Sequence, residues 1–357
     1  MQGPYHGRRI GTSAASTPCE HQHEQHHGRS EMVGMAPIRG FGTPASRLGH
    51  CVRGYDVSGA QPIGQTVGGP TGGCVERDGL RIAYLDWGDP SSDVAVDPLI
   101  VLHPNGFCAG VFDPLARRLG DRFRVVGVDL RGHGASETVT VPALLGNDAM
   151  ALDVLAVADE LEVDHFHLLG VSLGGGVAIE VASAAPERVR ALMLCEAIAI
   201  DSTAGDQQHF SFGDGEHPLA VGARRRRAVW PDRATIVESY GARPPLAAMA
   251  PEALAAYVRW GFVDRPDGQV ELACAPETEA AVFDSGDRHG PTHTFERLVD
   301  IACPVSVLAG TDTDLARTWF GAQADLLGVD LTLVDGGHFF LFEDLERGSV
   351  LIREHLG

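Results

Sequence analysis

The residue best suited to nucleophilic chemistry is Ser172, at the centre of the segment Gly170-Val171-Ser172-Leu173-Gly174. This G-x-S-x-G pattern lies between an apolar run at 165–171, typical of a buried strand, and a run of small apolar residues at 174–185, typical of a helix. A serine on such a strand-to-helix turn has a strained backbone and an exposed hydroxyl. The flanking glycines let neighbouring backbone pass close by, and the helix N-terminus favours developing negative charge. We therefore expect Ser172 to be a nucleophile.

A serine nucleophile needs a general base, and His338 is the candidate. It follows the predicted strand 331–334 in the segment Asp335-Gly336-Gly337-His338. Functional groups of a parallel sheet gather at the carboxyl ends of its strands. Ser172 and His338 both occupy such positions, so we expect them to meet.

A carboxylate must hold the imidazole in the tautomer that accepts the serine proton. Asp312 and Asp314 follow the predicted strand 305–309, and Glu196 lies near the end of the strand after the nucleophile helix. Asp312 and Asp314 are two positions apart, so in an extended chain they point the same way. The pattern alone does not choose between them, and Glu196 stays an alternative.

An oxyanion requires backbone N–H donors. One should be Leu173, the residue after the nucleophile. The other should come from the loop His103-Pro104-Asn105-Gly106-Phe107, which follows the predicted strand 98–103. Pro104 has no N–H, so we expect Asn105 to donate, with Phe107 as the second choice.

The elements that carry these residues alternate between strands and helices. Apolar runs predict a hairpin at 75–87 and buried strands at 98–103, 123–130, 165–171, 189–198, 304–309 and 331–334. Helical spacing occurs at 110–119, 148–161, 174–185, 316–327 and 345–356. This alternation predicts an α/β fold with a parallel sheet covered by helices on both faces.

The alternation is interrupted once. Residues 199–299 contain loops and helical segments at 234–240 and 251–260, so we expect a helical insertion between two parts of the core, 74–198 and 300–357. Residues 1–73 are rich in Gly, Pro, Ser, Gln and His without a hydrophobic period, which predicts a disordered tail. Within the insertion, Arg224–Arg227 is expected to be a solvated basic segment, with attraction of a substrate carboxylate or phosphate as the alternative.

From about residue 75 to 357 the chain resembles the α/β-hydrolase superfamily, including uncharacterised actinobacterial members. The residues that carry the resemblance are the His103–Phe107 loop, the segment from Asp129 to Ser136, the turn Gly170–Gly175, and Gly337-His338-Phe339. The resemblance implies an eight-stranded, mostly parallel sheet, with a cap after the sixth strand that corresponds to 199–299. It also implies the order serine, acid, histidine along the chain.

The resemblance also bears on the acid. Thr313 occupies the family's usual acid position, and His103-Pro104 replaces its common His-Gly pair. Some members carry a Ser/Thr-Asp pair at this point, matched by Thr313-Asp314, so we prefer Asp314 to Asp312 and Glu196. A serine nucleophile separates the chain from haloalkane dehalogenases and epoxide hydrolases, which use aspartate there. We expect Phe107, Trp230, Trp260 and Phe339 to line the substrate pocket, although packing within the cap would explain the two tryptophans equally well.

Composition excludes several other classes of protein. The formal net charge of −20 argues against a nucleic-acid partner, and the absence of lysine excludes Schiff-base chemistry. The seven cysteines form no C-x-x-C pair, so we expect reduced thiols, no metal and no cofactor. No apolar run reaches the roughly 18–20 residues that span a bilayer, and no signal peptide is evident. A cytoplasmic protein without a membrane partner is expected.

These features predict an enzyme that hydrolyses a small-molecule carboxylic ester, or a related acyl compound, through an acyl-enzyme. The same triad supports carbon–carbon bond hydrolysis, acyl transfer to an alcohol, or perhydrolysis. The alternative outside enzymes is a receptor that binds a small molecule without turnover.

Overall fold

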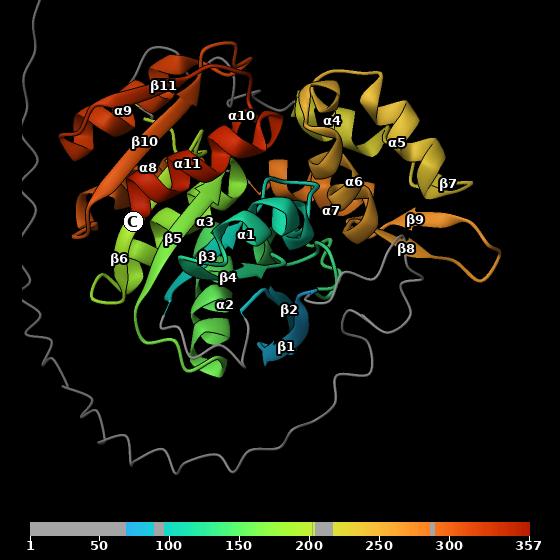
Figure 1. The fold of residues 1–357 in the computed structure, drawn as a ribbon, viewed down its shortest axis with the longest axis horizontal. Coiled ribbons are helices and arrows are strands. Elements are labelled where there is room, and N and C mark those ends of the chain that lie inside the picture. The colour runs from blue at the N-terminus through green and yellow to red at the C-terminus, as the bar shows by residue number, and fades with distance from the viewer. Residues whose placement is uncertain (1–68, 89–95, 202, 204–216, 286–289) are drawn as a thin grey trace, which may run out of the picture. The chain divides into compact units, whose positions relative to one another are not determined.

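The apolar runs form one eight-stranded sheet in the computed structural model, which describes residues 69–88, 96–201, 203, 217–285 and 290–357 (Figure 1). The sheet order is β1-β2-β4-β3-β5-β6-β10-β11. β2 pairs antiparallel with β1 and β4, and all other neighbours are parallel. The expected mostly parallel sheet is therefore confirmed. The strands are β1 Thr71–Arg77, β2 Leu80–Asp86, β3 Asp97–Leu102, β4 Phe123–Val128, β5 Phe166–Val171, β6 Val189–Cys195, β10 Val305–Gly310 and β11 Leu331–Val334.

Two apolar layers lie on opposite faces of this sheet, because successive side chains of a strand point to opposite sides. Leu99 and Val101 of β3 join one cluster, which includes residues of α1, α10 and α11. Ile100 and Leu102 join the other, with residues of α2, α3 and α9. These helices are α1 Asp113–Leu119, α2 Asn147–Glu160, α3 Leu173–Ala184, α9 Arg317–Leu327, α10 Phe340–Glu343 and α11 Leu345–Leu356. The core strands are thereby covered on both faces.

The segment between β6 and β10 contains helices together with a small sheet that the sequence did not indicate. Its helices are α4 Pro218–Arg224, α5 Arg233–Gly241, α6 Pro251–Trp260, α7 Pro276–Phe283 and α8 Pro291–Glu296. Three short strands, β7 Val229–Trp230, β8 Phe262–Asp264 and β9 Val270–Leu272, pair antiparallel in the order β7-β9-β8. Figure 1 shows α4–α7 and these strands grouped on one side of the large sheet.

The N-terminal expectation differs from the structure at its boundary. β1 begins at Thr71, so the last residues of the expected tail are part of the sheet, and residues 1–68 lie outside the described part of the chain. Cys108, Cys195, Cys274 and Cys303 are free thiols, but Cys74 is disulfide-bonded, which corrects the expectation of reduced thiols there. Within the described ranges, no helix combines the length and apolar character needed to cross a membrane.

Candidate active site

The nucleophile turn joins β5 directly to α3. Ser172 has φ 56° and ψ −117°, a backbone conformation that residues other than glycine rarely adopt. Two glycines make it possible: a Cβ on Gly170 would lie 2.3 Å from the carbonyl oxygen of Gly174, and a Cβ on Gly174 would lie 2.3 Å from that of Leu102. The Ser172 N–H donates to the Cys195 carbonyl at 3.0 Å, which anchors the turn to the end of β6.

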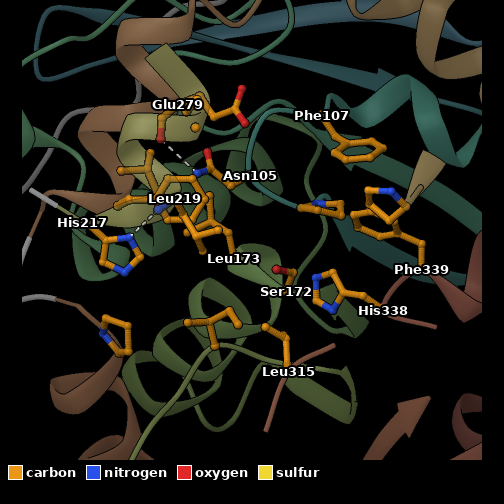
Figure 2. A pocket seen from close by; sticks show the side chains of 18 of the residues that line it. Asn105, Phe107, Ser172, Leu173, His217, Leu219, Glu279, Leu315, His338 and Phe339 are labelled. Atoms are coloured by element: carbon orange, nitrogen blue, oxygen red, sulfur yellow. Dashed lines mark hydrogen bonds between the residues drawn. The ribbon is translucent and has the colours of Figure 1, made fainter. Parts of the chain in front are cut away.

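His338 reaches the same edge of the sheet from the loop after β11. A Cβ on Gly310 would lie 2.5 Å from the carbonyl oxygens of Gly336 and Gly337, so the end of β10 and this loop are in close contact. Figure 2 shows the His338 ring beside the Ser172 side chain. No hydrogen bond joins these two residues in the described part of the chain, and such contacts often tighten only when substrate binds.

The carboxylate that contacts His338 belongs to Glu196. Its Oε2 lies 2.5 Å from Nδ1 of His338. The same carboxylate accepts hydrogen bonds from the Gly310 N–H at 2.7 Å and from the Thr313 hydroxyl at 2.7 Å. Glu196 is fully buried and has a positive φ of 48°. These three contacts hold the buried carboxylate in one position.

We expected Asp314 to be the acid that contacts His338, and the structure differs from this expectation. Asp314 and Asp312 are both exposed in the loop after β10. Thr313, between them, points its hydroxyl at Glu196 instead of supplying a carboxylate. In the sheet, β6 lies between β5 and β10, and the Glu196 side chain passes the end of β10, where it accepts the Gly310 N–H, to contact His338 in the loop after β11. The alternative Glu196 is the acid that meets His338.

The two expected oxyanion donors, Leu173 and Asn105, line the same cavity as the nucleophile. Leu173 begins α3, so its N–H has no partner inside the helix. In the loop after β3, the Pro104 carbonyl accepts hydrogen bonds from Nδ1 of His103 at 2.8 Å and from the Phe107 N–H at 3.2 Å. The Phe107 N–H is therefore already engaged. Because a trans peptide points its N–H opposite to its carbonyl, fixing the Pro104 carbonyl also fixes the direction of the Asn105 N–H.

Two buried histidines form hydrogen bonds that hold this loop and its neighbour in place. Nε2 of His103 accepts the Leu130 N–H at 3.0 Å, and Nε2 of His133 accepts the Gly106 N–H at 3.1 Å. Burial lowers the pKa of His133 to about 4 and that of His103 well below its usual value. Both rings are therefore neutral at physiological pH. Their role is to hold the loop.

Asp129 has a structural role. Its carboxylate accepts the N–H groups of Ala109 and Ala135 at 2.7 and 2.8 Å, so it joins two loops beneath the site.

A cavity of about 500 Å³ opens at Ser172 and His338. Phe107 and Phe339 line it as expected, but Trp230 and Trp260 do not. These two side chains are buried in an apolar cluster instead, and a Cβ on Gly110 would meet the Trp260 ring at 2.1 Å. Trp230 and Trp260 therefore pack the inserted segment, which corrects their assignment to the pocket. The cavity walls include Ile198, Ile200, Leu219, Ala223, Leu246, Val282, Phe283 and Leu315.

Several polar groups of the cavity gather in one wall. Arg226 is paired with Glu279, and Tyr240, Tyr257 and Asn105 lie in the same wall. Exposure alternates along the arginine run, since Arg225 and Arg227 are exposed whereas Arg224 and Arg226 are partly buried and paired with acidic residues. The expectation of a wholly solvated segment is therefore wrong at these two positions. Among the described residues, no group of three or more His, Cys, Asp or Glu is arranged to hold a metal ion.

Comparisons with known proteins agree with the fold. The model of the alpha/beta hydrolase fold family matches residues 97–243. The chain is 42% identical over 96 residues to the pimeloyl-acyl-carrier-protein methyl ester esterase of Nitrosomonas europaea, a match that covers 27% of this chain and 35% of that one. It is 34% identical over 126 residues to the N-formylmaleamate deformylase of Pseudomonas putida, which covers 35% and 44% of the two chains. The chain thus spans less than half the length of both relatives.

Solved structures extend the likeness beyond the matched segment. The crystal structure of E-2-(acetamidomethylene)succinate hydrolase superposes with a TM-score of 0.64 at 19% identity, covering 80% of this chain and 99% of that one. At this identity the likeness concerns the fold alone.

Proposed function

We propose that this chain, which belongs to the α/β-hydrolase superfamily, is a serine hydrolase that cleaves a small-molecule carboxylic ester through an acyl-enzyme. One observation carries the proposal: the buried Glu196 carboxylate lies 2.5 Å from Nδ1 of His338, on a ring beside the strained Ser172. A buried carboxylate, an imidazole and a strained serine in this order form the arrangement that activates a hydroxyl.

The first half of the reaction follows from the tautomer. In the neutral imidazole whose Nδ1–H donates to Glu196, Nε2 carries no proton and can accept the one on Ser172. Ser172 Oγ then bonds to the ester carbonyl carbon, and the carbonyl oxygen becomes an anion that accepts the N–H groups of Leu173 and Asn105. His338 gives its proton to the alkoxide as the carbon–oxygen bond breaks, so an alcohol leaves and the acyl group stays on Ser172.

The second half repeats these steps with water. His338 takes a proton from a water molecule, whose oxygen attacks the acyl carbon. The tetrahedral intermediate collapses to a carboxylic acid and returns the proton to Ser172. Apart from the ester and one water molecule, no group outside the chain is needed to balance the reaction.

The cavity favours a mainly apolar substrate. Most of its exposed wall is apolar, although Asn147, His217, Ser285, Thr292 and Asp314 also line it. The partly buried Arg226 is paired with Glu279. Apolar surface removed from water contributes about 25 cal/mol per Å² to binding, so affinity should grow with acyl length until the cavity is full. One relative is named as an ester hydrolase and another as a deformylase, so an ester is one of the acyl classes that the relatives support.

A substrate panel tests this proposal. Purified full-length protein and its Ser172→Ala variant should be assayed on p-nitrophenyl esters from acetate to dodecanoate, beside lactones and a vinylogous 1,5-diketone. The expected result is ester hydrolysis with an optimum at intermediate chain length and a loss of about 10⁶-fold in the variant. Cleavage of the diketone alone would indicate carbon–carbon bond hydrolysis, and equal rates for both proteins would reject a serine mechanism.

A further inference from the structure

The loop 103–107 after β3, which contains the proposed oxyanion donor Asn105, is hydrogen-bonded to the inserted segment at two points. The Tyr257 hydroxyl, on α6, donates to the Gly106 carbonyl at 2.9 Å. The Asn105 side-chain amide donates to the backbone carbonyl of Glu279, on α7, at 3.1 Å. The Gly106 N–H donates to the His133 ring. The N–H and the carbonyl of Gly106 therefore both have fixed partners, the first in the core and the second in the inserted segment.

The direction of the Tyr257 hydroxyl is set by a cation. Arg226 donates to the Tyr257 oxygen at 2.8 Å and to the Tyr240 oxygen at 3.2 Å. Because arginine is only a donor, Tyr257 must accept from it, and its own proton is directed to Gly106. Burial raises the pKa of Tyr257, so the phenol keeps that proton.

The same cation is neutralised and tightly packed against the loop. Arg226 forms an ion pair with the carboxylate of Glu279, so the cluster offers little net charge to an anionic substrate. A Cβ on Gly106 would lie 2.8 Å from Nη1 of Arg226 and from the Glu279 carboxyl carbon. The ion pair thus packs against the backbone of Gly106, which follows the proposed oxyanion donor Asn105.

We propose that Tyr257, oriented by the Arg226–Glu279 ion pair, is a positioning residue that holds the Asn105–Gly106 segment in the conformation that binds the oxyanion. The inference rests on the proposed function. It assigns the inserted segment a part in transition-state stabilisation in addition to enclosing the cavity. Electrostatic stabilisation depends on donors that are already in place before charge develops, so loosening this loop should affect the transition state more than the bound substrate.

Tyr257→Phe tests the inference, because it removes only the hydroxyl and keeps the ring, whose centroid lies 4.4 Å from that of Phe107. Losing an entire oxyanion donor costs about 10²–10³-fold in kcat. Losing one support of that donor should cost less, about 10-fold in kcat, with KM within about twofold. An alkylboronic acid, which forms a tetrahedral anion on the serine, should bind about 10-fold more weakly, whereas an alcohol product should bind as before. Tyr84→Phe, on β2, is the matched control for loss of a phenol hydroxyl and should leave all four values unchanged.

The outcomes separate the two proposals. If the unmodified protein hydrolyses no ester and binds no boronate, the proposed function fails and the inference fails with it. If the unmodified protein is active but Tyr257→Phe keeps its kcat and boronate affinity, the inference alone is wrong. A rise in KM equal to the fall in kcat, with equal weakening of the boronate and the alcohol, would also reject it, because that pattern indicates general loosening of the cavity. A thermal melt of each variant confirms that folded proteins are compared.

Discussion

Replacing Glu196 by glutamine should lower kcat by about 10³–10⁴-fold, the loss found when the acid of such a triad becomes an amide. The structure explains why the amide cannot substitute. The Glu196 carboxylate accepts from Gly310 through Oε1 and from both Thr313 and His338 through Oε2. If the glutamine oxygen faces Gly310, its NH₂ faces His338 and favours the tautomer with the proton on Nε2. In that tautomer, Nε2 cannot accept the Ser172 proton.

The opposite orientation of the amide is also unfavourable. With its oxygen toward His338, the glutamine NH₂ would face the Gly310 N–H, and two buried donors would meet at 2.7 Å. An unsatisfied buried donor costs about 1–3 kcal/mol, so the first orientation should dominate. A loss of 10³–10⁴-fold corresponds to about 4–5.5 kcal/mol in the activation barrier.

Steady-state kinetics on the best ester of the panel would measure this loss. Asp314→Asn is the matched variant, since it makes the same chemical change at an exposed residue that lines the cavity, whereas Glu196 is the acid bonded to His338. It should retain most of kcat. Thermal melts should show that both variants are folded. A large loss in Asp314→Asn with near-normal activity in Glu196→Gln would refute the assignment of Glu196 and restore the original preference for Asp314.

Three further perturbations follow from the contacts around the site. Gly174→Ala should destabilise the protein by about 3 kcal/mol in urea unfolding, because its Cβ would meet backbone, whereas Gly321→Ala, in open space on α9, should not. Thr313→Val should lower kcat by about 10-fold through loss of a hydrogen bond to a charged acceptor; an unchanged kcat would show that His338 and Gly310 hold Glu196 without it. Because the pKa of His133 is lowered to about 4 in the folded protein, the unfolded state binds more protons than the folded state between pH 6.5 and 4. Stability should therefore fall by up to about 3 kcal/mol as pH decreases through this window, and His133→Gln should flatten the slope.

Much of the fold could be predicted because the strands of the large sheet are apolar runs between helices of clear period. The superfamily resemblance and the mostly parallel sheet are confirmed. The small sheet of the inserted segment was missed because β7 has two residues and β8 and β9 have three each. Strands this short show too little alternation to be recognised in sequence.

The site was predicted less evenly. Ser172 and His338 each follow a strand with a distinctive glycine pattern, and the structure brings them side by side (Figure 2). The acid could not be chosen because β6 and β10 both end near a carboxylate, and only the side-chain contact between Glu196 and His338 shows which one meets the histidine. The available signal was a single glutamate directly after the apolar run Ala191–Cys195. The burial of Trp230 and Trp260 depends on contacts with distant segments, which local sequence does not contain.

The central claim is that Ser172 is the nucleophile, and covalent labelling tests it most directly. The full-length protein should be incubated with a fluorophosphonate, digested, and analysed by mass spectrometry beside Ser172→Ala. We predict one phosphonyl group on Ser172, protection by the bound carboxylic acid product, and no label in the variant. Labelling at another residue, or an unmodified Ser172 in a folded protein, would contradict the account.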